Sequence, residues 1–366
     1  MHTVTYAMLI GFLSIICLVL WNPVVANASI LVNSAATDPA AAITSSSNNI
    51  NNYNYANGES NIATITTTKK LNLVTSVAPI ANIVKNIGGD KIELTQLIPD
   101  GVDSHTFELT PSGVIKVQNA DLVIINGLHL ESAVEKVSNA SRTHDPSQQL
   151  LKLADNTINK SQWIFDFSFP KEKGDPNPHL WLNIANAMNY ATLVRDKLIQ
   201  MDPKNSNYYK TNADMYLTLL KRLDEGIKAA VQTIPLQNRK LLTYHDSWAY
   251  FAPRYGMTVI GAVQPSDFGE PTPQDVAKLI DQVRNEKVPA LFGSEVFPSK
   301  VMEQIGNEGH IRFVTTLADD VLPGKPTDTN HTYVGMMIEN MHNMIIPLGG
   351  SIVSLTGINP ADTYVH

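Results

Sequence analysis

Short apolar runs alternate with segments of helical spacing along most of this chain, starting at Leu71. A short apolar run bounded by turn residues is typical of a buried strand, and strands buried on both faces belong to parallel sheets. The predicted strands are residues 71–77, 92–98, 122–126, 241–244, 259–262, 290–293 and 313–315. The predicted helices are residues 79–87, 111–119, 248–255, 273–285, 300–307 and 333–344. This alternation predicts an α/β fold in which helices cover both faces of parallel sheets.

The alternation falls into two halves, which are separated by a mostly helical stretch. Within that stretch one apolar stripe recurs every three or four residues, namely Tyr216, Leu219, Leu220, Leu223, Ile227, Ala230 and Val231. A single helix over residues 206–234 would be about 43 Å long, enough to run along two lobes and join them rigidly. An ordinary helix packed on one lobe fits the same periodicity. We expect an N-terminal lobe over residues 69–202, a linker helix over 203–235 and a C-terminal lobe over 236–366.

Residues 1–28 are typical of a signal peptide. Residues 7–21 are almost wholly apolar, and Ala26, Asn27 and Ala28 form an A-x-A cleavage pattern. No Lys or Arg precedes Lys69, and the apolar stretch approaches the ~20 residues that span a bilayer, so an uncleaved membrane anchor is the alternative. Residues 29–68 are rich in Asn, Ser, Thr and Ala, and they predict a disordered tether. We therefore expect an extracytoplasmic protein, in the periplasm or on the outer cell surface, secreted or anchored by its N-terminus.

The charge balance and the cysteine count exclude several classes of protein. The chain has 27 Lys and Arg against 34 Asp and Glu, which gives a formal net charge of -7. A nucleic-acid-binding protein needs a basic face to neutralise phosphate, so we expect no nucleic-acid partner. Cys17 is the single cysteine, which excludes a disulfide framework and a cysteine-rich zinc module. Any metal ion must therefore be bound by His, Asp and Glu.

Three of the 10 histidines stand where α/β proteins bind ligands. His105 and His245 each follow a predicted strand, and the carboxyl ends of parallel strands form the usual binding edge. His179 follows Pro176 and Pro178, which fix the backbone at the entry to the helical stretch. A lone histidine is more often a surface residue or a satisfied core residue. The similar positions of these three nevertheless indicate a shared metal site.

Four separated blocks carry a resemblance to a known family. They read DSHTFE at 103–108, NPHLWL at 177–182, HDSWAYF at 245–251 followed by RYG at 254–256, and LADDVL at 317–322. In this order they resemble the motifs of the solute-binding proteins of zinc and manganese ABC importers, the ZnuA-like or TroA-like metal receptors. Ser104 stands where the family usually has Pro, and Asn177 where it has Asp. The resemblance covers roughly residues 70 to 347.

The resemblance implies two lobes joined by one long rigid helix, with a metal ion bound in the cleft between them. It assigns the ligand role to His105, His179, His245 and Asp320, and Asp319 is the nearest rival to Asp320. Three imidazoles and a carboxylate suit tetrahedral zinc, whereas manganese prefers more oxygen. Manganese-selective relatives tend to place Glu where this chain has His245. We therefore expect Zn²⁺ as the transported ligand, with Mn²⁺ or iron as the alternative.

Two acidic residues near these blocks have more ordinary interpretations. Glu108 is either an acceptor that orients His105 or a residue that caps the turn. Glu295 follows a predicted strand, and we interpret it as a neighbour of the metal rather than a ligand.

The family resemblance implies a receptor and not an enzyme. Such a protein captures Zn²⁺ outside the cytoplasm and delivers it to the membrane permease of an ABC importer, which works with a cytoplasmic ATPase. We expect a monomer, in which rigid linkage confines metal release to local movement at the ligands. A zinc hydrolase is a rival, but four protein ligands leave no position for water, and the motifs H-E-x-x-H and G-x-S-x-G are absent. A surface adhesin with a structural metal (a cell-adhesion role) is a third alternative.

Overall fold

The computed structural model describes residues 69–297 and 300–366, all within one compact unit. The predicted signal or anchor over residues 1–28 and the predicted tether over residues 29–68 lie outside these ranges. None of the helices in the described ranges is both long and apolar enough to cross a bilayer.

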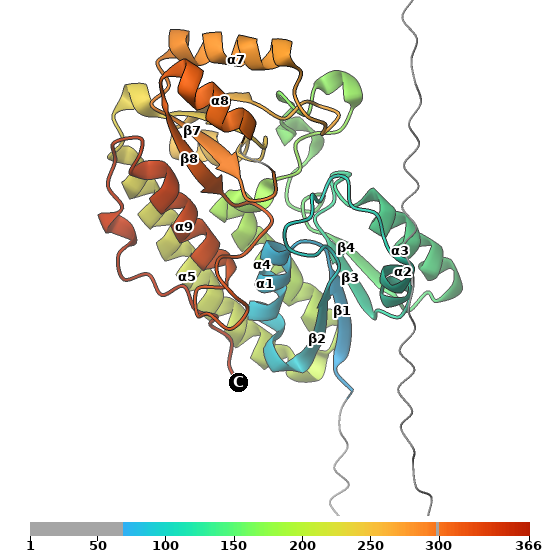
Figure 1. Ribbon diagram of the computed structural model, residues 1–366. Coiled ribbons are helices and arrows are strands. Elements are labelled where there is room, and N and C mark those ends of the chain that lie inside the picture. Colours follow the sequence, from blue (N-terminus) through green and yellow to red (C-terminus); the bar gives the residue numbers. More distant parts are fainter. Residues whose placement is uncertain (1–68, 298–299) are drawn as a thin grey trace, which may run out of the picture. The chain divides into compact units, whose positions relative to one another are not determined.

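Two four-stranded sheets of the same topology organise the fold (Figure 1). The strand orders are β2-β1-β3-β4 and β6-β5-β7-β8, and every strand pair is parallel. The first sheet contains β1 (Leu71–Thr75), β2 (Ile92–Gln96), β3 (Leu122–Ile125) and β4 (Gln149–Lys152). The second contains β5 (Lys240–Thr243), β6 (Thr258–Ala262), β7 (Ala290–Ser294) and β8 (Arg312–Leu317). The predicted α/β class with parallel sheets is confirmed.

Helices cover both faces of each sheet. The α-helices are α1 (Ala78–Gly88), α2 (Pro111–Gln118), α3 (Ser132–His144), α4 (Ile184–Met201), α5 (Ser206–Gln232), α6 (Phe251–Tyr255), α7 (Pro273–Glu286), α8 (Lys300–Gly309) and α9 (Tyr333–Ile345). Short 3-10 helices are η1 (Gly89–Lys91), η2 (Lys160–Gln162), η3 (Lys171–Lys173), η4 (Leu180–Leu182), η5 (Pro203–Asn205), η6 (Leu236–Asn238) and η7 (Val353–Leu355). Figure 1 shows α1 and α4 on one side of the first sheet and α2 and α3 on the other.

Local sequence fixes where several of these helices begin. Thr110, Thr272 and Thr332 are the N-caps of α2, α7 and α9, and each side chain accepts a backbone N–H from the first turn. Pro111 and Pro273 then occupy the first turn of α2 and α7, where a missing N–H costs nothing. The predicted starts of these helices agree with the structure for this reason.

The predicted long helix is confirmed as α5, which contains 27 residues. It packs against α1 and α4, which precede it, and against α6 and α9, which follow it. We call residues 69–205 the N-terminal half and residues 233–366 the C-terminal half. The lobe boundaries given above stay a prediction, because the tail of the chain returns to the N-terminal half. There Asp362 pairs with Lys85 at 2.8 Å and accepts hydrogen bonds from Asn82 and Asn86.

The sequence did not predict α3 and β4, and it placed the start of α6 too early. Strand β4 reads QLLK and is only half-buried throughout, so it lacks the apolar run on which the prediction depends. Helix α6 begins at Phe251 rather than at residue 248, because the residues before it form the loop that carries His245.

Candidate metal centre

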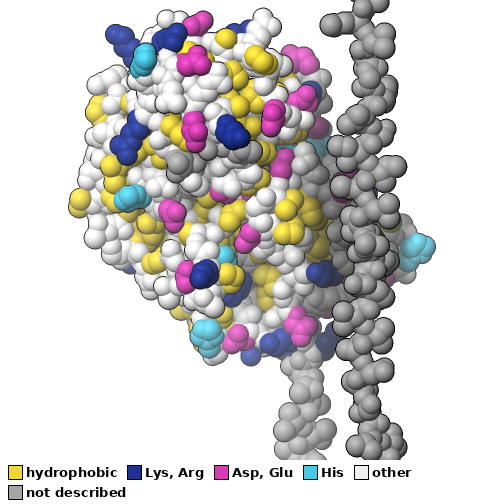
Figure 2. Space-filling model, viewed as in Figure 1, with side chains coloured by type: hydrophobic (Ala, Val, Ile, Leu, Met, Phe, Trp, Pro, Cys, Tyr) yellow, Lys and Arg dark blue, Asp and Glu magenta, His cyan; other side chains and the backbone are white. Residues whose placement is uncertain are grey.

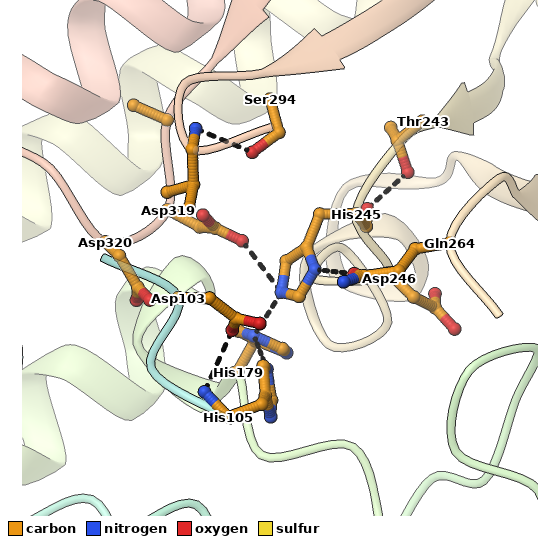
Figure 3. A network of polar contacts seen from close by, with 12 residues as sticks. Asp103, His105, His179, Thr243, His245, Asp246, Gln264, Ser294, Asp319 and Asp320 are labelled. Atoms are coloured by element: carbon orange, nitrogen blue, oxygen red, sulfur yellow. Dashed lines mark hydrogen bonds and ion pairs between the residues drawn. The ribbon is translucent and has the colours of Figure 1, made fainter. Parts of the chain in front are cut away.

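Loops at the ends of the strands bring three histidines together. His105 lies in the loop between β2 and α2, and His245 follows β5 by two residues. His179 immediately precedes η4. Figure 3 shows the three imidazoles converging from these separate segments. Within the described part of the chain they form the one group of three or more His, Cys, Asp or Glu whose ligand atoms lie close enough to hold a metal ion, all within 4.8 Å of one another.

The Nε2 atoms of the three rings face one another. His179 Nε2 is 3.2 Å from His105 Nε2 and 3.0 Å from His245 Nε2. Asp319 Oδ2 lies 3.4 Å from His245 Nε2 on the side of the second sheet. Ligand atoms around a tetrahedral Zn²⁺ with bonds of about 2.0–2.1 Å are about 3.3 Å apart, so the two spacings from His179 to the other rings fit one small ion. Asp319 is near His245 but lies outside the group of three whose ligand atoms are all within 4.8 Å of one another.

Amide side chains hold two of the rings in the orientation that a metal requires. Asn177 donates through its Nδ2 to Asp166 and to the backbone oxygen of Asp246, so its Oδ1 is left to accept a hydrogen bond from His179 Nδ1 at 2.8 Å. Gln264 Oε1 contacts His245 Nδ1 at 2.5 Å in the same way. When Nδ1 carries the proton, the lone pair of Nε2 is free to bind a metal ion.

The electrostatics of the cluster favour uncharged imidazoles. Burial lowers the pKa of His105 well below its usual value, and the neighbouring His245 lowers it further. Burial also lowers the pKa of His179 well below its usual value, and His245 and His105 add to the effect. Neutral imidazole is the form that binds a metal ion, so the site is ready for a cation without first losing protons from these two rings.

The structure brings Asp319, not the predicted Asp320, against the histidines. Figure 3 shows the Asp319 carboxylate pointing at the His245 ring, whereas Asp320 interacts with His245 only electrostatically, without an ion pair or hydrogen bond to any of the three described imidazoles. Both carboxylates are buried, and Asp319 Oδ2 and Asp320 Oδ1 have no hydrogen-bond partner. Asp319 and Asp320 lie in a bend that follows β8, and Asp319 is the one whose carboxylate pairs with His245. Asp320 as the fourth ligand stays a prediction, and this contact favours its rival Asp319.

Two other acidic residues shape the loops around the site. Glu295 Oε1 accepts the backbone N–H groups of both Asp319 and Asp320, at 2.8 and 2.9 Å. Asp103 Oδ1 accepts the backbone N–H of His105 at 2.9 Å. Glu108 is exposed, and Asp103 rather than Glu108 makes this contact with the His105 segment. Glu295 thus positions the loop that carries Asp319 and Asp320, and its interpretation as a neighbour of the metal rather than a ligand stays a prediction.

Sequence reasoning did not identify Gln264 or Asp103 as members of the site. Gln264 follows β6 by two residues, just as His245 follows β5, so its position at the binding edge of the sheet was an available signal. Asp103 stands two residues before His105, the spacing at which an Asp side chain accepts a backbone N–H within a turn.

Aromatic side chains surround the imidazoles and limit the access of water. Trp181 is fully buried, lies 5.1 Å from the His179 ring, and donates its indole N–H to the backbone oxygen of Asp319. Phe169 packs against both His105 and His179. On the part of the face that Figure 2 leaves uncovered, acidic and basic side chains are interspersed rather than gathered by sign.

Comparisons with known proteins agree on one type of molecule. A family model described as "Zinc-uptake complex component A periplasmic" (ZnuA) matches residues 73–345, a range that includes all three histidines and Asp319. The manganese ABC transporter substrate-binding lipoprotein PsaA of Streptococcus pneumoniae is 30% identical over 282 residues, which cover 75% of this chain and 88% of that protein.

Solved structures match a similar share of the chain. The periplasmic zinc binding protein TroA from Treponema pallidum has a TM-score of 0.69 at 28% identity, over 76% of this chain and 99% of that chain. A Mn-bound periplasmic metal binding protein from Candidatus Liberibacter asiaticus has a TM-score of 0.66 at 26% identity, over 76% of this chain and 100% of that chain.

Proposed function

Given that this chain belongs to the family of the periplasmic zinc-uptake complex component A, a family of solute-binding proteins and not of enzymes, we propose that it captures Zn²⁺ outside the cytoplasm for an ABC importer. The coarser statement, that it is the substrate-binding component of a metal ABC transporter, follows from the family itself. The choice of metal, the ligands and the route to the membrane are our inference.

The donor set is the observation that supports zinc. We propose that His105, His179, His245 and Asp319 bind the ion, with three imidazole nitrogens and one carboxylate oxygen. His179 Nε2 lies 3.2 and 3.0 Å from the other two Nε2 atoms, which fits an ion with short tetrahedral bonds. Asp319, 3.4 Å from His245 Nε2, would complete the set by moving closer to the other two rings. Two of the rings are already oriented by Asn177 and Gln264, so little reorganisation is needed when the metal binds.

Manganese is the second candidate, and the relatives support it. The protein PsaA of Streptococcus pneumoniae carries manganese in its name, and a structural match from Candidatus Liberibacter asiaticus is Mn-bound. Manganese prefers more oxygen ligands than this cluster offers, so it would need a second carboxylate oxygen or water. The nitrogen-rich donor set therefore favours zinc.

The partners follow from the proposed role. A receptor of this kind delivers its ion to a membrane permease that is driven by a cytoplasmic ATPase, and the similar streptococcal protein is named a lipoprotein. We propose that the N-terminal segment, residues 1–28, either directs export or holds the protein at the membrane. The tether over residues 29–68 would then let the receptor reach its permease.

Metal content and affinity test the proposal directly. The purified protein is expected to bind one Zn²⁺, and His179→Ala is expected to lower the affinity by more than about a hundredfold. His342→Ala is the matched control, because His342 is exposed on α9 and belongs to the same residue type. Competition between Zn²⁺ and Mn²⁺ in one titration separates the two candidates, and a clear preference for Mn²⁺ would overturn the choice of zinc.

A further inference from the structure

Only one of the three imidazoles reaches the surface. A pocket of about 180 Å³ opens beside the cluster, and its lining includes His105, Phe169, Phe268, His129 and Ser168. His179 and His245 are 0% and 5% exposed and do not line it. An ion that exchanges with solvent through this pocket therefore passes the His105 ring.

Phe268 covers the outer face of that ring. The two rings are stacked, with centroids 4.5 Å apart and planes within 8°. Phe268 comes from the loop between β6 and α7 in the C-terminal half, whereas His105 belongs to the N-terminal half. The stack therefore connects the two halves directly across the opening of the site.

The backbone of Phe268 adopts a conformation that aromatic residues disfavour. Its φ is +60°, in the left-handed region, where a side chain crowds the following carbonyl. A tight turn holds it there, because the Phe268 N–H donates to the Pro265 oxygen at 3.0 Å and the Gly269 N–H donates to Asp267 Oδ1 at 3.1 Å. Strained positions of this kind cluster at ligand clamps.

A second contact fastens the same loop. Lys173, from η3, donates a hydrogen bond to the backbone oxygen of Ser266. Phe169 fills the space behind, with its ring 5.4 Å from His105 and 5.7 Å from Phe268. The Phe268 ring thus packs against Phe169, and the loop that carries it is held by the hydrogen bond from Lys173.

We propose that Phe268 is a gate that sets the rate at which the metal ion enters and leaves the site, an inference that rests on the proposed function. Stacking on His105 closes the pocket side of the cluster, and rotation of the strained loop uncovers it. Phe268 does not bind the metal itself. It is a positioning residue, and it acts on the path of the ion rather than on the bound state.

Release kinetics test this gate. The full-length protein is loaded with Zn²⁺ and mixed in a stopped-flow instrument with an excess of a chromogenic zinc chelator. In Phe268→Ala the dissociation rate is expected to rise about three- to tenfold, the effect of losing one ring stack. The association rate is expected to rise with it, so that Kd changes by less than the dissociation rate.

Three further variants separate a gate from a general structural role. Phe268→Tyr keeps the ring and is expected to release Zn²⁺ at the wild-type rate. Phe167→Ala is the matched control, because Phe167 is a phenylalanine with 49% exposure outside the pocket, and its release rate is expected to stay within twofold. Lys173→Met, which unties the loop without touching the ring, is expected to raise both rates by a smaller factor, and it tests the gate even where Phe268→Ala does not fold.

The outcomes are distinguishable. Unchanged rates in Phe268→Ala and Lys173→Met, while His179→Ala abolishes binding, would overturn the gate and leave the proposed function intact. A higher dissociation rate with an unchanged association rate would also overturn it, because Phe268 would then only stabilise the bound state. A wild-type protein that takes up no metal would overturn the proposed function, and the gate with it.

Discussion

The two sheets share one topology but differ in regularity. In the N-terminal half, β1 pairs with β2 over five consecutive residues and β3 with β4 over four, without any shift of register. In the C-terminal half, the register shifts between Leu241 and Leu242 on β5 and between Phe292 and Ser294 on β7. The irregular strands are those whose ends lead to His245 and Glu295. Regular pairing thus supports one side of the site and irregular pairing the other.

The two hydrophobic cores also differ, and the smaller one belongs to the C-terminal half. The larger core includes both faces of the first sheet, α5 and the inner side of the second sheet with α6 and α9. The smaller core lies between the outer face of the second sheet and α7 and α8, and its buried residues include Met302 and Leu291. Because the loop that carries Phe268 leads into α7, we expect the side of the site that yields during metal exchange to be the C-terminal one.

The largest expected effect is on metal affinity. Loss of a histidine from either half should weaken Zn²⁺ binding to a similar extent. His179→Ala removes a ligand from the N-terminal half and His245→Ala one from the C-terminal half, and each is expected to weaken Zn²⁺ binding by more than about a hundredfold. Both apo proteins should keep a cooperative unfolding transition, since neither ring belongs to a hydrophobic core. Competition titrations and thermal unfolding measure the two quantities.

A marked asymmetry between these variants would break the comparison. If His245→Ala retained most of the affinity, the C-terminal half would not supply an essential ligand. If either variant failed to fold without metal, the metal would be structural and the transport role would lose its support.

The next largest effect concerns the two cores. Ile83→Ala and Met302→Ala each remove a fully buried side chain, Ile83 from the larger core and Met302 from the smaller one. Each is expected to cost about 2–5 kcal/mol of local or global stability. For Ile83→Ala, hydrogen exchange should accelerate throughout both halves. For Met302→Ala, we expect faster exchange confined to α7, α8 and the strands they cover, and uniform acceleration would mean that the two cores unfold as one.

The difference in strand regularity between the two sheets was not predictable from the sequence. Both sheets present similar short apolar runs, such as LVII in β3 and ALFGS in β7, so the pattern predicts strands equally well in both halves. Register depends on contacts between strands that are distant in the sequence, and no local pattern encodes a shift between Phe292 and Ser294. The helices that begin at a Thr-Pro pair were predictable, because an N-cap is a local device.

The convergence of the three histidines was predictable, whereas the carboxylate that lies against them was not. Three histidines at strand ends or beside proline are a pattern that sequence carries. The choice between Asp319 and Asp320 depends on which side chain the bend after β8 turns toward His245, and Glu295 holds the backbone N–H groups of both residues in that bend. A shift of one residue leaves the composition of the segment unchanged, so no local pattern distinguishes the two carboxylates.

A smaller effect is expected where α5 joins the C-terminal half. Asp224 on α5 accepts hydrogen bonds from Arg254 Nε at 2.8 Å and from the Tyr255 hydroxyl at 2.7 Å. Asp224→Asn removes the charge that pairs with Arg254 and is expected to cost about 1–2 kcal/mol in the free energy of unfolding. Asp214→Asn, at an exposed position of the same helix, is the control and should change it by less than about 0.5 kcal/mol. If both variants changed the free energy of unfolding equally, apolar packing alone would hold α5 against the C-terminal half.

The smallest effect is that of pH on Zn²⁺ affinity, about tenfold per pH unit. It distinguishes the two halves by the pH range in which their metal-facing side chains take up a proton. In the N-terminal half, burial lowers the pKa of His105 and His179, so these rings are neutral at pH 7 and remain so well below pH 6.5. In the C-terminal half, burial raises the pKa of Asp319 well above its usual value, and the negative charge of Glu295 raises it further. A metal ion that binds to Asp319 must displace that proton.

The sign of the pH dependence follows from these two shifts. Protonation of a ligand opposes the metal only below the pKa of that ligand in the folded protein, so His105 and His179 should not weaken binding until the pH falls well below 6.5. Below the raised pKa of Asp319, each unit of falling pH should cost about tenfold in affinity, the equivalent of one proton. Calorimetry in buffers of different ionisation enthalpy counts the protons released, and Asp319→Asn should abolish this release while leaving weaker binding to the three histidines. If Asp319→Asn also released a proton on binding Zn²⁺, that proton would come from an imidazole. The histidines would then not all be neutral before the metal binds, and protonation would no longer distinguish the N-terminal half from the C-terminal half.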